Sequence, residues 1–389
     1  MEHNNKIDYN NKVVSIEQGM KFIGDGYFAL DPHCHSSYSY DVPDADNASP
    51  EKIVKMQKLK GLGNILTDHN TIEGYKYLRR KGTRIIPAVE LTFKPRIARK
   101  IISNRPIQTL HINIFGLNND DMAAINEIAQ RGDLDELIKY LRQNDLDWMY
   151  NHPFYHSKKE HLNWRIIPAL AKNYFDVIEL NSSYSKGLND ITQKLAENLN
   201  KGIVAGSDSH TGNPGTALVI AEGKNFKDFW ENVKDGNAYV VRRDMNTANI
   251  VHEASLIINQ AFKARLRPRP GRKYTPATTV EPFDNLMKSV TSGRLKDKFI
   301  AKKVIQMILQ SINYTAVPLF AWRFHVTKNE ETAQRIRNRM NILTNNILTN
   351  KIDLMKKNHQ HNNPNNHARP KYYGADLVER SKKQLINKI

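Results

Sequence analysis

The chain has 389 residues, 40% of them hydrophobic, so it can bury a large core, and we expect one large domain with an appendage. Cys34 is the only cysteine, which excludes a scaffold held together by internal disulfides. The formal net charge of +18 is concentrated in residues 251–389, which contain 26 Lys and Arg but only 9 Asp and Glu. No apolar run has the roughly 18 residues of a spanning helix, and no signal-peptide-like stretch begins the chain. We therefore expect a soluble, cytoplasmic protein.

Seven short apolar runs between residues 27 and 210 each end near a polar or acidic residue. Helix-like segments separate several of them. Strands that alternate with helices predict a parallel sheet, and a barrel is one way to close such a sheet. The expected strands are 27–30, 64–66, 84–89, 109–115, 146–150, 176–180 and 202–205, and the expected helices are 50–59, 120–130, 134–142, 165–172 and 189–199. The helix at 50–59 has a clear start signal, because Ser49 at the N-cap precedes Pro50 at the first helical position.

The chain changes character beyond Asp244. Residues 246–282 read as a basic linker rich in Pro and Gly, and residues 283–389 as a basic, mainly helical region with an Asn- and His-rich tail. Such basicity suggests a polyanionic partner, with nucleic acid the main candidate and no membrane expected. A solvated basic tail without a partner is an equally good interpretation.

The strand ends carry residues that bind metal ions. His33 and His35 follow the first strand and, at positions i and i+2, would point to one face. A single histidine is more often a structural residue than a ligand. Recurrence at successive strand ends weakens that interpretation, because buried charges need partners and metal ions would supply them together. Asp41 lies in the loop that follows His35, and the later strand ends contribute Asp68, His69, Glu90, His111, His152, Asp208 and His210.

These residues resemble the PHP family, named for polymerase and histidinol phosphatase, over roughly residues 27–242. The most specific segments are 33–41, 66–74 and 206–210. The resemblance implies a distorted seven-stranded (β/α)7 TIM-like barrel at residues 27–245, preceded by an N-terminal segment at 1–26. It also implies two or three divalent ions, such as zinc, manganese or iron. In the implied arrangement, His33, His35, Glu90 and Asp208 hold one ion, Glu90 bridges to a second held by His111 and His152, and Asp41, His69 and His210 hold a third.

Several placements stay open in the sequence. Asp44 and Asp46 lie in the same loop as Asp41, although the spacing favours Asp41. Asp68 could orient a ligand or cap a helix, and the strand register of His111 is uncertain by one residue. Cys34 is expected to pack rather than to react. Arg96, Arg99, Arg242 and Arg243 are candidates for phosphate contacts, but each is more typical of a surface charge.

A cluster of divalent ions favours hydrolysis at neutral pH. We expect a phosphatase or phosphodiesterase in which a metal-bridging hydroxide attacks a phosphate ester, with Glu90 and Asp208 as the catalytic residues. The basic C-terminal region favours nucleotides or nucleic acid as substrates. The alternatives are a PHP-type amidohydrolase or small-metabolite phosphatase, and a nucleic-acid-binding protein whose basic region is the functional part.

Overall fold

The computed structural model describes residues 7–42, 44, 46–95, 109–154, 163–164 and 166–246, with 248–249, 252–253, 256, 260 and 333–337. The chain forms two compact units, residues 1–337 and 338–389, and all described residues belong to the first. The predicted linker at 246–282 and helical region at 283–389 therefore lie almost entirely outside the described residues. No described helix is long and apolar enough to cross a membrane.

One sheet has four strands in the order β1-β9-β8-β2. These are β1 (Val13–Val14), β9 (Tyr239–Val241), β8 (Leu218–Ala221) and β2 (Phe28–Leu30). Helix α1 (Ile16–Gly24) begins with a capping box between Ser15 and Gln18. It buries Gly19 against Val241, where an added Cβ would lie 2.5 Å from Val241 Cγ2. The sequence reading missed α1, β1, β8 and β9.

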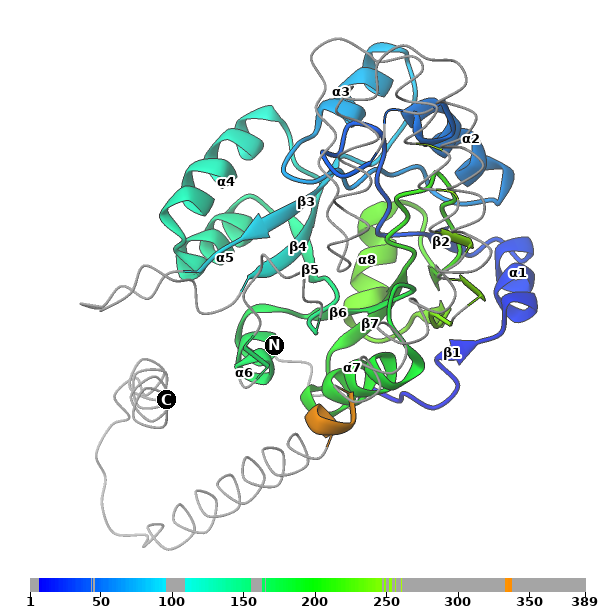
Figure 1. Ribbon diagram of the computed structural model, residues 1–389, viewed down its shortest axis with the longest axis vertical. Coiled ribbons are helices and arrows are strands. Elements are labelled where there is room, and N and C mark those ends of the chain that lie inside the picture. The colour runs from blue at the N-terminus through cyan, green and yellow to red at the C-terminus, as the bar shows by residue number, and fades with distance from the viewer. Residues whose placement is uncertain are drawn as a thin grey trace, which may run out of the picture. The chain divides into compact units, whose positions relative to one another are not determined.

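The second sheet has five strands in the order β3-β4-β5-β6-β7 (Figure 1). Its first three strands are antiparallel neighbours, and only β5-β6 and β6-β7 pair in parallel. The expected all-parallel sheet is therefore wrong. The strands are β3 (Ala88–Phe93), β4 (Leu110–Phe115), β5 (Asp147–Tyr150), β6 (Val177–Asn181) and β7 (Gly202–Gly206).

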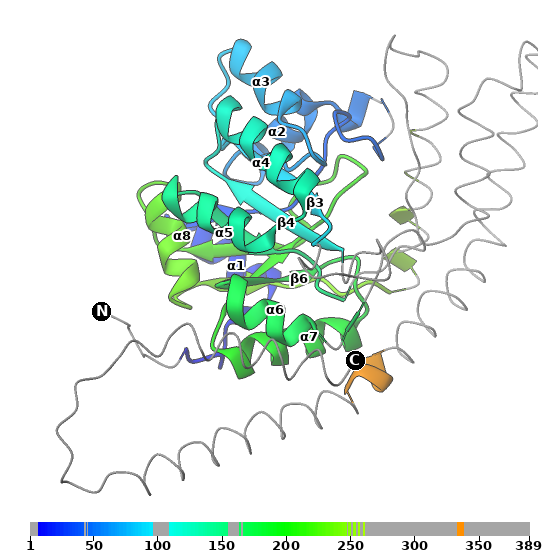
Figure 2. The same cartoon turned by 90° about the vertical axis from the view of Figure 1, so that its left-hand side faces the viewer.

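The helices between the strands explain these directions. Two helices, α4 (Asn119–Arg131) and α5 (Leu134–Gln143), pack together between β4 and β5 (Figure 2). Two helices return the chain to the end at which it left, so β5 runs antiparallel to β4. A single helix, α6 (Ile167–Tyr174) or α7 (Lys186–Leu199), precedes β6 or β7, and single crossovers give parallel neighbours.

The remaining helices precede β3 or follow β8 in the chain. The predicted helix at 50–59 is confirmed as α2 (Pro50–Leu59), although the Ser49 side chain does not cap it. The short 3-10 helix η1 (Asp46–Ala48) precedes α2. The sequence reading missed α3 (Glu73–Arg80) and α8 (Phe226–Lys234). Helix α8 inserts Phe229, Trp230 and Val233 into the core.

Isolated bridges connect segments that are not assigned as strands. Cys34 bridges to Ser209, Ile65 to Ile86, and His69 to Glu90, all in parallel. The predicted strand at 64–66 is thus reduced to a single bridge, because its neighbours do not continue the ladder. Among the described residues the strands form two sheets and not one closed barrel. The bridges nevertheless pair the segment after β2 with the segment after β7, and residues 65–69 with the chain at β3. Thr67 N donates to Cys34 O at 2.9 Å and connects the two pairs, which brings the histidine-rich segments together.

Candidate metal centre

Four side chains from three distant segments meet in the interior. His33 Nε2 lies 3.1 Å from His35 Nε2, 3.2 Å from Glu90 Oε2 and 3.4 Å from Asp208 Oδ1. His35 Nε2 lies 3.2 Å from both Glu90 Oε2 and Asp208 Oδ1. Five of the six distances among these four atoms thus fall between 3.1 and 3.4 Å.

Those spacings match the donor atoms of a coordination shell. Ligand atoms about 2.0–2.1 Å from an ion are separated by about 3.0 Å in an octahedron and about 3.4 Å in a tetrahedron. Glu90 Oε2 and His35 Nδ1 are buried without a hydrogen-bond partner among the described residues. A cation at the centre of the cluster would satisfy the Glu90 oxygen, so the donor set fits a divalent metal ion.

The second carboxylate oxygen of Glu90 faces two further histidines. Glu90 Oε1 lies 2.9 Å from His111 Nδ1 and 3.2 Å from His152 Nε2. The β4 register therefore turns His111 into the cluster and resolves the uncertainty left by the sequence. Asn151 Nδ2 also donates to Glu90 Oε1 at 3.0 Å. Glu90 consequently stands between two groups of imidazoles, as a bridging ligand must.

Asp41, His69 and His210 form a third group of close side chains. His69 Nε2 lies 3.1 Å and His210 Nε2 2.9 Å from Asp41 Oδ2, while His69 Nδ1 lies 3.0 Å from Glu90 Oε2. The Nδ1 atom of His210 faces the Asp208 carbonyl at 2.8 Å, so Nδ1 carries the proton in the neutral imidazole, and Nε2 would be the atom that binds an ion. The structure thus brings all nine predicted ligands into one cluster.

The backbone is strained at two of these positions. His152 has φ +23° and Asp208 φ +50°, conformations that ordinary residues adopt at a cost of about 1–3 kcal/mol. Buried Asp31 supports the Asp208 segment, because its Oδ1 accepts from Ser207 N at 2.9 Å and its Oδ2 from Gly215 N at 2.5 Å. The fold therefore holds these ligands in place at the expense of local stability.

The three carboxylates of the cluster have strongly lowered pKa values. Burial raises the pKa of Glu90, but His69, His33 and His111 outweigh that effect and hold the pKa well below its usual value. The pKa values of Asp41 and Asp208 are likewise held well below normal against burial by adjacent imidazoles. All three carboxylates are thus ionised, which is the form that binds cations.

Two residues left open by the sequence have structural roles. Asp68 Oδ1 accepts from Ser36 N at 2.6 Å and Oδ2 from Ser36 Oγ at 2.8 Å, so it holds the loop after His35. It does not cap α3, whose N-cap is Ile72. Cys34 is buried, its thiol donates to Ile65 O at 3.3 Å, and burial raises its pKa well above normal. The thiol is therefore a packing group, as expected.

The sequence reading missed two polar residues at the sixth strand. Glu179 is fully buried in β6 and accepts from His33 Nδ1 at 2.8 Å. Asn181, at the end of the same strand, donates to Asp208 Oδ2 at 3.3 Å. The available signal was a carboxylate in the middle of an apolar strand, since such a charge is not buried without partners.

The arginine candidates for phosphate binding are not placed in the cluster. Arg242 pairs with Asp190 at 2.7 Å and with Asp244 at 2.6 Å, and Arg243 lies 3.8 Å from Glu253. Arg96 and Arg99 lie outside the described residues.

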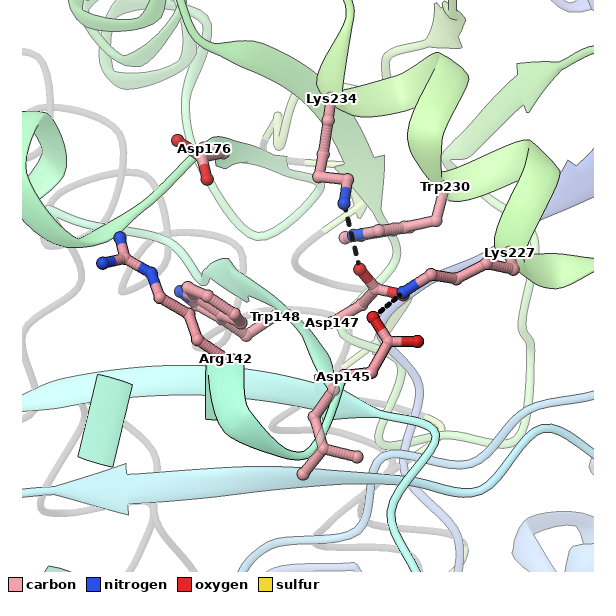
Figure 3. A pocket seen from close by; sticks show the side chains of 9 residues that line it. Arg142, Asp145, Asp147, Trp148, Asp176, Lys227, Trp230 and Lys234 are labelled. Carbon is pink, nitrogen blue, oxygen red and sulfur yellow. Dashed lines mark hydrogen bonds and ion pairs between the residues drawn. The ribbon is translucent and has the colours of Figure 1, made fainter. Parts of the chain in front are cut away.

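A separate cavity of about 240 Å³ lies at the amino end of β5, whereas His152 follows its carboxyl end (Figure 3). Its charges are largely paired, because Asp147 lies 3.3 Å from Lys234 and 3.4 Å from Lys227, which also contacts Asp145 at 2.8 Å. The cavity shares no residue with the histidine cluster, so the cluster is the stronger candidate for chemistry.

No protein-family model and no curated protein sequence matches the chain. Solved structures do match. PsfC from Pseudomonas syringae is 16% identical, covers 60% of this chain and 96% of its own, and has a TM-score of 0.42. The lesion-specific endonuclease PfuEndoQ from Pyrococcus furiosus is 17% identical over 55% of this chain and 57% of its own, with a TM-score of 0.39.

A third match is a two-domain protein from Bacteroides vulgatus that contains a predicted PHP-like metal-dependent phosphoesterase. It is 13% identical, covers 67% of this chain and 75% of its own, and has a TM-score of 0.37. The chain is similar to PHP-like proteins.

Proposed function

We propose that this chain is a PHP-type, metal-dependent hydrolase of phosphate esters. The observation that carries the proposal is Glu90, whose two buried oxygens each face a different set of imidazoles at 2.9–3.2 Å. A carboxylate so placed is suited to bridge two ions. Clusters of this type occur in two-metal sites that hydrolyse phosphate esters.

The balance of charge favours an anionic substrate. Zinc, manganese and iron fit a donor set of imidazoles and carboxylates. Two or three divalent ions would bring four to six positive charges into a site whose nine donors include three carboxylates, Asp41, Glu90 and Asp208. The remaining positive charge would attract a phosphate group more strongly than a neutral amide.

The protein groups have distinct roles in this proposal. Bound ions would supply an activated water and neutralise the phosphate charge. Glu90 holds the two ion sites at a fixed separation. Asp208 ligates in its ionised form and is oriented by Asn181, whose Nδ2 lies 3.3 Å from Asp208 Oδ2. The burial of the ligands excludes bulk water and strengthens these electrostatic interactions.

We interpret the two sheets and their connecting bridges as a distorted seven-stranded barrel that spans residues 27–245. The bridge between Cys34 and Ser209 and the bridge between His69 and Glu90 support this interpretation. In this interpretation the linker at 246–282 and the helical region at 283–389 form an extension to the barrel.

Metal content and turnover test the proposal together. Protein purified without chelators should contain two or three divalent transition-metal ions per chain. Glu90→Gln should lose most of them and lose more than about 100-fold in hydrolysis of an aryl phosphate. Glu73→Gln, at an exposed glutamate of α3, is the matched control and should change neither quantity.

The same assay should include an aryl phosphodiester and an aryl amide. Turnover of either phosphate substrate supports the proposal. Turnover of the amide alone would instead identify an amidohydrolase, and full metal content in Glu90→Gln would refute the bridging role of Glu90.

The basic extension supports nucleotides or nucleic acid as the substrate class. Its excess of Lys and Arg begins after residue 250. The barrel depends on the first residues of this region, because Glu253 Oε2 accepts from Thr211 Oγ1 at 2.8 Å and Gln260 Nε2 donates to Thr211 O at 2.6 Å. Thr211 directly follows His210, so a truncation that spares the site must keep Gln260.

A chain that ends at residue 262 separates catalysis from polyanion binding. We expect it to keep hydrolysis of a small aryl phosphate and to lose affinity for a single-stranded oligonucleotide. That loss should be largest at low salt, as for electrostatic binding to phosphates. Unchanged oligonucleotide affinity would contradict a binding role for the extension. Retained oligonucleotide binding by the full chain without any hydrolysis would favour a purely nucleic-acid-binding protein.

A further inference from the structure

Glu179 is hydrogen-bonded, directly or through Asn181, to the chain segments that carry three of the candidate ligands, His33, His152 and Asp208. Its Oε1 accepts from His33 Nδ1 at 2.8 Å, and its Oε2 accepts from His152 N at 2.8 Å. Oε2 also accepts from Asn181 Nδ2 at 3.2 Å, and that amide donates to Asp208 Oδ2 at 3.3 Å. One fully buried carboxylate thus contacts His33 and His152 directly and Asp208 through one amide.

The contact with His33 decides which of its nitrogens can bind a metal. An ionised carboxylate can only accept, so the proton of the neutral imidazole must sit on Nδ1. Nε2 is then left with its lone pair directed at Glu90 and His35. A carboxylate behind a ligating histidine fixes its tautomer and orientation and increases its basicity.

The contact with His152 fixes a strained backbone. His152 has φ +23°, and its N–H points at Glu179 and not into a regular ladder. The hydrogen bond helps to hold this conformation, which directs the His152 ring at Glu90 Oε1. Glu179 therefore acts on ligands of both ions that Glu90 would bridge.

The fold keeps space for this carboxylate. Gly206 ends β7 opposite Asn181, and a Cβ on Gly206 would lie 2.2 Å from Glu179 Oε1 and 2.7 Å from His33 Cβ. Any other residue at position 206 would push the carboxylate away from His33. The position of the Glu179 carboxylate therefore requires glycine at position 206.

We propose that Glu179 is a positioning residue that sets the metal affinity of the two sites joined by Glu90, and that Gly206 provides the space it needs. The inference rests on the proposed metal centre. It predicts that changing Glu179 weakens only two of the three ion sites, because Asp41, His69 and His210 make no described contact with Glu179. The third site should therefore be independent of it.

Glu179→Gln is the most informative substitution. Glutamine has one amide oxygen and one NH₂ group. If its oxygen accepts from His33 Nδ1, the NH₂ group faces the donors His152 N and Asn181 Nδ2. In the opposite orientation the oxygen accepts from those two donors and the NH₂ group faces His33 Nδ1. If it faces His33, the imidazole proton moves to Nε2 and blocks ligation. We expect the dissociation constants of two ions to rise by about 10- to 100-fold and that of the third to stay unchanged.

Two further variants separate positioning from folding. Gly206→Ala keeps the charge of Glu179 but displaces it, and should weaken the same two ions. Asp121→Asn changes another buried acid, in α4, which accepts from Tyr140 Oη at 2.9 Å and from Asn118 N at 2.8 Å and has no described contact with a candidate ligand. It should lower stability without changing metal affinity.

The measurements are competition titrations with a chromophoric chelator and the visible spectrum of the cobalt-substituted protein, alongside urea unfolding of the metal-free chain. Selective loss of two ions in Glu179→Gln supports the inference. If the variant binds every ion with the same affinity as the wild-type chain, the inference is overturned. Loss of all three ions in proportion to lost stability also overturns it. If the wild-type chain binds no divalent ion, the proposed function itself fails.

A direct observation on the wild-type chain does not depend on whether the variants fold. Nitrogen-15 NMR of the zinc-loaded protein should show His33 with a protonated Nδ1 and an unprotonated Nε2. The opposite tautomer would refute the role of Glu179.

Discussion

His210 Nε2 lies 2.9 Å from Asp41 Oδ2, although the two residues are 169 positions apart in the chain. Asp41 also lies 3.1 Å from His69, so one loop carboxylate joins two histidines from segments far apart in the chain. Electrostatics reflect this closeness: burial lowers the pKa of His210, but Asp41 and Asp208 outweigh it and raise the pKa to about 10. Asp41, His69 and His210 therefore form a closely spaced group within the cluster.

We expect Asp41→Asn to remove about one ion per chain and to leave the other two. The amide cannot supply the negative charge that now lies between His69 and His210. Elemental analysis after dialysis measures this change. Asp46→Asn, at an exposed acid of the same loop, should keep full metal content. Equal losses in both variants would show that Asp41 has no special role.

Gly74→Ala should destabilise the protein although it lies in a helix. An added Cβ would lie 2.4 Å from Asp68 Oδ2 and 3.1 Å from Ser36 Oγ, and would disturb the buried bonds between those side chains. Breaking them leaves buried polar groups unpaired, at a cost of about 1–3 kcal/mol. Urea unfolding checks this. Gly24→Ala in α1, where a Cβ meets nothing within 4 Å, should be neutral or slightly stabilising.

The Asp190–Arg242 pair should make stability depend on pH. Burial raises the pKa of Asp190, but Lys186 and Arg242 lower it more, so its folded pKa lies below the usual 3.8. A depressed folded pKa gives stability that is present above the unfolded pKa and is lost as pH falls through the folded one. Asp190→Asn should therefore cost up to about 1 kcal/mol at pH 7, because the pair is partly solvated.

That difference between wild type and Asp190→Asn should shrink as the pH falls from the unfolded pKa of Asp190 through its lower folded pKa. Urea unfolding at pH 7, 5 and 3 measures it. Asp176→Asn removes a more exposed ion pair with Lys201 and should have a smaller effect at pH 7. A constant difference at all three pH values would contradict the prediction.

Cys34 should resist alkylation in the native protein. Its side chain is 1% exposed and its thiol is hydrogen-bonded to Ile65 O. Iodoacetamide should label it only after unfolding in urea, with label incorporation followed by mass spectrometry. Rapid labelling of the native chain would show that the segment between His33 and His35 opens in solution.

Much of the fold could be predicted from local patterns. The apolar runs located β2, β3, β4, β5, β6 and β7 to within a few residues, and the N-cap and Pro signals placed α2 correctly. Strand direction could not be predicted in the same way, because it depends on how many helices lie in each connection and how they pack. The two-residue strand β1 depends wholly on its pairing with β9 and has no local signal.

The nine candidate ligands were recognisable in the sequence because His and acidic residues recur at the ends of the apolar runs, and the resemblance to the PHP family implied their grouping. Their contacts required the tertiary structure, since Glu90 meets His33, His111 and His152 only when β3 and β4 lie beside the segments after β2 and β5. Glu179 lies inside its strand and not at a strand end, so its signal was an acid within an apolar run, and its partners were known only from the fold. The sequence alone thus determined which metal-binding side chains the chain carries. Only the folded chain decided which atoms face one another, because interatomic distances of about 3 Å between residues up to 169 positions apart depend on packing.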